Sequence, residues 1–96
     1  MSKKTTVSLG NALDIMHASA LKTRLTTALA KNMPVVLISD KIEKADTAGL
    51  QLIYAFIKKV ELQGSTVTWQ KPSDMLYQAC EILGMSNAIK LVEKLD

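Results

Sequence analysis

Residues 35–60, VVLISDKIEKADTAGLQLIYAFIKKV, decide the fold. They contain an unbroken apolar run, a polar loop and a long amphipathic run. Residues 35–38 are apolar at every position, which is typical of a central strand in a sheet. After the loop at residues 41–45, apolar side chains recur at helical spacing, at Leu50, Ile53, Phe56, Ile57 and Val60. The segment therefore predicts a buried strand that leads through a loop into an amphipathic helix, which Gly64 is placed to end.

The sequence before this segment predicts a strand and a helix of its own. Residues 6–9 alternate like a half-buried strand, and residues 12–13 form a second, shorter apolar patch. Asp14 is placed to cap a helix that runs to about Ala30, and Asn32 and Pro34 end it.

The sequence after it repeats the alternation. Residues 66–69 alternate again, and a helix begins at residues 72–74 and ends at Gly84. A last short helix is expected from Ser86 or Asn87 to the terminus. Because strands that alternate with helices imply right-handed crossovers, we predict an α/β fold with a small mixed or mostly parallel sheet of roughly three to four strands and about four helices. We expect it to form one domain over residues 1–96.

Composition excludes several classes of protein. One cysteine and one histidine cannot supply an internal disulfide or a Cys/His zinc site, so we expect no metal and no cofactor. The net charge is only +3 and the lysines are scattered, which does not indicate nucleic acid binding. We expect neither a signal peptide nor insertion into a membrane, because the longest apolar-rich segment, residues 48–60, is interrupted by polar side chains. A cytoplasmic location fits best.

The candidate functional residues lie where the loop enters the central helix. Asp46 and Thr47 lie beside backbone N–H groups that have no partner within the helix, and either residue could cap it. From Thr47, steps of three and four residues lead to Gln51, Tyr54 and Lys58. This polar stripe on an apolar helix is either ordinary solvated surface or a surface that a partner covers.

At this point the chain resembles a known family. The residues that carry the likeness are Leu13-Asp14, the strand at residues 35–38, the element Ala45-Asp46-Thr47-Ala48-Gly49-Leu50, the strand at residues 67–69, Pro72-Ser73 and Leu83-Gly84. Together they resemble a STAS domain, the domain of anti-sigma factor antagonists and of sulphate-transporter tails. Two features depart from the family pattern: Thr stands where the best-known switched antagonists have Ser, and the amino-terminal region is short.

The resemblance implies a regulatory protein-binding module without enzymatic activity or catalytic residues. It implies that Thr47 is a phosphoacceptor and that the helix behind it forms a partner surface. The expected partner-binding residues are Asp46, Thr47, Ala48, Gly49, Gln51, Tyr54 and Lys58, with Lys41 and Lys44 flanking the loop. The implied protein partners are a serine/threonine kinase acting as an anti-sigma factor, a chemotaxis component, or the ATPase of a lipid transporter, and the oligomeric state stays open.

Two other interpretations compete with it. The start of the Asp46-Thr47 helix could hold the phosphate of a bound nucleotide, helped by Lys41 or Lys44. The string Asp46-Thr47-Ala48-Gly49 also invites comparison with aspartic proteases, but those enzymes need an all-β scaffold and a glycine in place of Ala48. Cys80 is expected in the core, and His17 on the surface.

Overall fold

The computed structural model describes residues 3–91 and shows a three-stranded parallel sheet with helices packed against it. The strand order is β1-β3-β5, with β1 at Thr5–Ser8, β3 at Val35–Ile38 and β5 at Val67–Gln70. The apolar strand β3 therefore lies in the centre, as its composition predicts. The helices are α1, Ala18–Leu29, α2, Thr47–Leu62, and α3, Asp74–Ile82.

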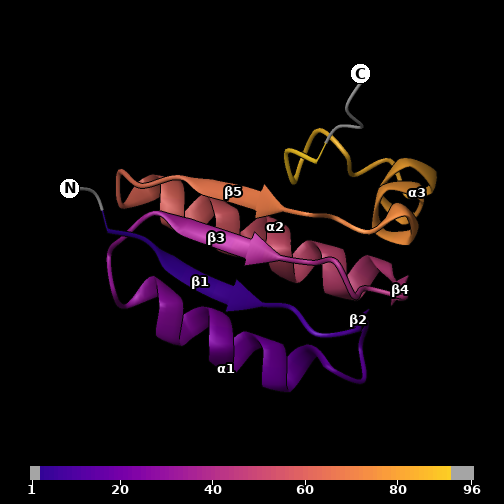
Figure 1. Ribbon diagram of the computed structural model, residues 1–96, viewed down its shortest axis with the longest axis horizontal. Helices are drawn as coiled ribbons and strands as arrows, with labels where there is room; N and C mark the ends of the chain where they lie inside the picture. Colours follow the sequence, from indigo (N-terminus) through magenta and orange to yellow (C-terminus); the bar gives the residue numbers. More distant parts are fainter. Residues whose placement is uncertain (1–2, 92–96) are drawn as a thin grey trace.

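The sheet has one face toward the helices and one face toward solvent. In β1 the side chains of Thr5 and Val7 are buried while those of Thr6 and Ser8 are exposed. Figure 1 shows α2 behind the sheet, α1 below β1, and α3 near the end toward which the strands point. The core between these layers is aliphatic, with Leu37, Leu50 and Ile53 fully buried.

Two further short strands form a separate, two-stranded sheet. Strand β2, Ala12–Leu13, pairs in parallel with β4, Lys44–Ala45. The short strand at residues 12–13 is confirmed, but the prediction that residues 41–45 are all loop is wrong, since Lys44 and Ala45 form a strand. A two-residue strand is too short to carry a visible alternation, which is why the sequence pattern did not show it.

Two helix predictions need correction. Helix α1 begins at Ala18 and not at Asp14, because the Asp14 carboxylate accepts a hydrogen bond from the backbone N–H of His17 and closes a turn ahead of the helix. A fourth helix is not found among the described residues, because residues 86–90 form turns; the rest of that expected helix, residues 92–96, lies outside the described residues. The described part of the chain thus has three helices where about four were expected.

Within residues 3–91, none of the helices combines the length and the apolar character needed to span a bilayer.

Candidate partner-binding site

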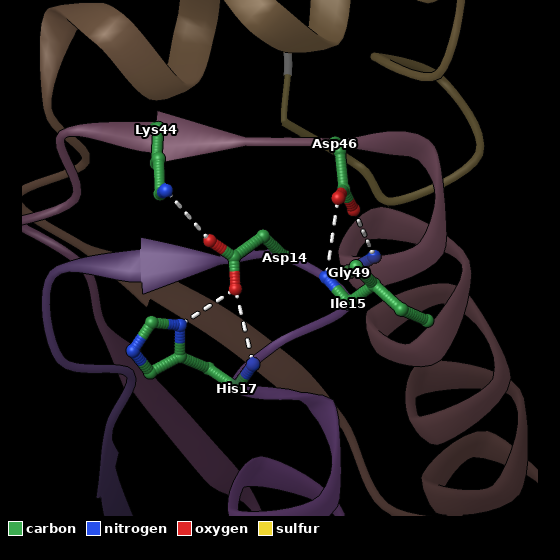
Figure 2. Close-up of polar contacts among 6 residues, drawn as sticks. All are labelled: Asp14, Ile15, His17, Lys44, Asp46 and Gly49. Carbon is green, nitrogen blue, oxygen red and sulfur yellow. Dashed lines mark hydrogen bonds and ion pairs between the residues drawn. The ribbon is translucent and has the colours of Figure 1, made fainter.

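The pairing of β2 with β4 brings two carboxylates from distant parts of the sequence to one end of the molecule. Leu13 pairs with Ala45, so the next residues, Asp14 and Asp46, leave the small sheet side by side. Figure 2 shows Asp14 on the segment that leads to α1 and Asp46 on the segment that leads to α2. Asp14 and Asp46 are therefore neighbours in the fold, although they lie far apart in the sequence.

Asp46 fastens the start of α2 to the loop before α1. As N-cap, its Oδ1 accepts a hydrogen bond from the N–H of Gly49 at 2.9 Å. Its Oδ2 accepts a second one from the N–H of Ile15 at 3.1 Å. The backbone N–H of Asp46 also donates to the carbonyl oxygen of Leu13 at 2.9 Å. One residue thus satisfies a helix end and positions the neighbouring loop.

Asp14 also fixes this loop, through hydrogen bonds with His17. Its Oδ1 lies 2.6 Å from the Nδ1 of His17 and 3.0 Å from the backbone nitrogen of the same residue. Its Oδ2 forms an ion pair with the Nζ of Lys44 at 3.2 Å. The hydrogen bond from the His17 side chain is the main reason why the pKa of Asp14 falls to about 2, with Lys44 adding to the effect.

Gly49 allows α2 to approach β2 more closely than any other residue would. A Cβ atom at this position would lie 2.1 Å from the carbonyl oxygen of Leu13. Gly49 is buried, so it has little surface to offer a partner, although we predicted it among the partner-binding residues. Its role in the structure is close packing.

Thr47 and the polar stripe behind it lie on the solvent side of α2. Because Asp46 is the residue that caps the helix, capping leaves the Thr47 hydroxyl unused. Thr47, Gln51, Tyr54 and Lys58 are all exposed, and the Lys58 ammonium lies 5.6 Å from the centre of the Tyr54 ring. Ala48 is half-buried beside them.

Lys41, in the loop after β3, and Lys44, in β4, differ in their surroundings. Lys44 is 66% exposed and is engaged with Asp14. Lys41 is exposed and forms no ion pair within the part of the chain that the structure describes. A phosphate held at the start of α2 would therefore compete with Asp14 for Lys44 and with Asp46 for the N–H of Gly49, which gives the nucleotide interpretation no support.

The remaining chemical candidates have structural roles. Cys80 is completely buried in the core, as predicted, and burial raises the pKa of its thiol to about 11. The His17 side chain is 53% exposed, in agreement with a surface position, but it is also the hydrogen-bond partner of Asp14. Trp69 is half-buried and donates from its ring nitrogen to the carbonyl oxygen of Ile89 at 2.9 Å.

Sequence reasoning did not foresee that the loop between β2 and α1 lies beside the start of α2. Ile15 and Met16 are 68% and 83% exposed, although both are large and apolar. The available signal was an apolar pair directly after Asp14 that fits neither the strand nor the helix pattern.

Comparison with known proteins agrees with this architecture. The family model described as "Mlab, STAS domain" matches residues 1–93. No curated protein matches the chain at a significant level.

Two solved structures share the fold. The anti-sigma factor antagonist SpoIIAA in its unphosphorylated form superposes with a TM-score of 0.69 at 14% identity, covering 100% of this chain and 84% of that one. The NMR structure of the protein TM1081 gives a TM-score of 0.68 at 19% identity, covering 95% of this chain and 72% of that one. Sequence, fold and family model agree, and the chain belongs to the STAS domain family.

Proposed function

We propose that this chain is a regulatory subunit without catalytic activity that binds a protein partner through the start of α2, and that phosphorylation of Thr47 switches the binding. The observation that carries the proposal is that Asp46 and Thr47 have different roles at the start of α2. Asp46 provides the cap and holds the neighbouring loop, while the adjacent residue Thr47 is exposed and has no part in the cap.

The polar stripe supports a binding role for this face. Gln51, Tyr54 and Lys58 continue from Thr47 along the exposed side of α2. Amide, phenol and lysine stem can be covered by a partner at lower cost than carboxylates, and Tyr is enriched in protein interfaces. The proposed partner surface therefore consists of Asp46, Thr47, Ala48, Gln51, Tyr54 and Lys58, with Lys41 and Lys44 at its edge.

The proposed switch acts on the partner and leaves the fold intact. A phosphate on Thr47 would add about −1.5 to −2 charges next to Asp46. A helix N-terminus tolerates negative charge because the helix dipole favours anions there, even where Asp46 already holds the N–H of Gly49. A surface fitted around a neutral hydroxyl, in contrast, would have to accept a bulky dianion.

Similar proteins suggest candidates for the partner. SpoIIAA is named as an anti-sigma factor antagonist, which favours an anti-sigma factor as the partner. The ATPase of a lipid transporter and a chemotaxis component, which the resemblance to STAS domains implies, are the other candidates.

The test is affinity capture from the native cells with wild type, Thr47→Glu, Thr47→Val and Thr47→Ser in parallel. We expect one protein to be recovered with wild type and Thr47→Ser and to be reduced at least about tenfold with Thr47→Glu. Mass spectrometry of the captured chain should find phosphate on Thr47. Equal recovery with all four forms, and no phosphate on Thr47, would overturn the switch.

A further inference from the structure

We propose that the chain pairs with a second copy of itself along strand β5, in an antiparallel two-fold contact centred on Thr68. This inference goes beyond the proposed function, because β5 shares no residue with the proposed partner surface at the start of α2. The two proposals therefore stand or fall separately.

Strand β5 has unpaired backbone groups along its outer edge. Figure 1 shows β5 at the edge of the sheet opposite to β1 and α1. The carbonyl oxygens of Thr66 and Gln70 accept hydrogen bonds from backbone N–H groups at the two ends of β3, at 2.9 and 3.3 Å. Because alternate residues of a strand face the same neighbour, the N–H and C=O groups of Val67 and Trp69 point outward. Nothing within residues 3–91 forms a hydrogen bond with these outward groups.

The opposite edge of the sheet is covered, and this contrast singles out β5. Arg24 of α1 donates to the carbonyl oxygen of Ser8 in β1 at 2.7 Å, and the inward-facing Val7 is only 6% exposed. The inward-facing side chains of β5, Val67 and Trp69, are only half-buried. Natural sheets protect free edges with charges, prolines or covering elements, because an unprotected edge is a template for another strand.

The sequence of β5 fits a second copy of the same strand. Residues 65–70, STVTWQ, contain no charged residue and no proline. With Thr68 opposite the Thr68 of the second copy, Val67 lies opposite Trp69 in both directions, so every outward N–H meets a C=O. A β-branched side chain opposite an aromatic one stabilises a strand pair. The same register sets Lys71 opposite Ser65, so like charges do not face each other.

The space beside β5 can receive the second strand. A shallow hollow of about 510 Å³ borders this strand, and its lining includes Val67, Trp69, Tyr77, Leu91, Lys71 and Lys90. The Trp69 ring is held by its hydrogen bond to the carbonyl oxygen of Ile89, and Lys90 forms an ion pair with Glu61. Side chains that are already fixed lose less conformational entropy on association, which favours pairing.

The test is the oligomeric state of the purified full-length chain, measured by sedimentation equilibrium at concentrations up to about 1 mM. We expect a monomer–dimer equilibrium for wild type. Thr68→Lys and Thr68→Glu should each weaken the dimer at least about tenfold, because like charges then lie opposite each other. A mixture of the two variants should dimerise again, since opposite charges then meet. Thr6→Lys and Thr6→Glu, on the exposed face of β1, are the matched controls and should behave as wild type.

A cysteine at the centre of the contact tests the register directly. In this register residue 68 forms a non-hydrogen-bonded pair, whose Cα atoms lie about 4.5 Å apart, within reach of a disulfide. We expect Thr68→Cys to give a covalent dimer under mild oxidation and Thr6→Cys to give none; the native Cys80 is buried.

Three results would overturn the proposal. They are a wild type that stays monomeric at every concentration, a dimer that both charged Thr68 variants leave intact, and a mixture of these variants that does not dimerise. Circular dichroism of the Thr68 variants checks that they are folded, which is expected because the side chain is exposed.

Discussion

At the scale of single residues, Asp46 is the most informative side chain in the structure. Its position before a helix predicted a cap, and it does cap α2 through Gly49. Its second oxygen, which holds Ile15, follows from the pairing of β2 with β4 and could not be read from the sequence, because that contact spans 31 residues.

Substitution of Asp46 should separate its two hydrogen bonds. Asp46→Ala removes both, and we expect a loss of about 1–3 kcal/mol in the free energy of unfolding. Asp46→Asn should cost less, because the amide oxygen can still accept one of them. Urea titration followed by circular dichroism measures both. Equal stability of wild type and Asp46→Ala would show that the cap and the loop contact do not stabilise the fold.

Asp14 should make stability depend on pH in the acid range. Its pKa is about 2 in the folded chain, below its ordinary value of 3.8. A lowered pKa stabilises the folded state above the ordinary value, and this stabilisation is lost as pH falls from there through about 2. Melting temperatures measured between about pH 5 and about pH 2 should therefore fall less steeply for Asp14→Asn than for wild type. Parallel curves for the two forms would contradict the assignment.

At the scale of elements, the helices and strands with a clear hydrophobic pattern of their own were predictable, and those that depend on distant contacts were not. The apolar run indicated the central place of β3, and helical spacing predicted α2, while Ser73 and Gly84 marked the start and end of α3. Strand β4 and the late start of α1 were missed, because both depend on contacts that the local pattern does not show.

Gly49 tests the close packing of α2 on β2. In an ordinary helix Gly→Ala stabilises by about 1 kcal/mol. Here a Cβ would lie 2.1 Å from the Leu13 carbonyl oxygen, so we expect Gly49→Ala to destabilise by about 2 kcal/mol or more.

Gly64→Ala is the matched control for this substitution. That glycine has a φ of +82° and no atom within 4 Å of an added Cβ, so the cost should be limited to about 1 kcal/mol of backbone strain. Denaturant titration of both variants measures the two changes in the free energy of unfolding. A Gly49→Ala protein as stable as wild type would mean that α2 does not rest directly on β2.

At the scale of the whole molecule, the fold gathers its proposed binding residues at one end. Because β1, β3 and β5 are parallel, α1 and α2 both begin at the end where β2 pairs with β4. Figure 1 shows these starts together, at the end toward which the strands point. The α2 half of this end was predictable from the Asp46-Thr47 element. The position of the α1 start beside it, where Asp46 holds the N–H of Ile15, became visible only once the strands were paired.

Titration of the purified partner into wild type and Thr47→Glu, with calorimetry as the readout, tests the central claim most directly. We predict that Thr47→Glu raises the dissociation constant at least about tenfold, which is about 1.4 kcal/mol. The melting temperature of the unbound variant should stay close to that of wild type, because a negative charge at a helix N-terminus does not destabilise it. Equal dissociation constants for the two proteins would contradict the account.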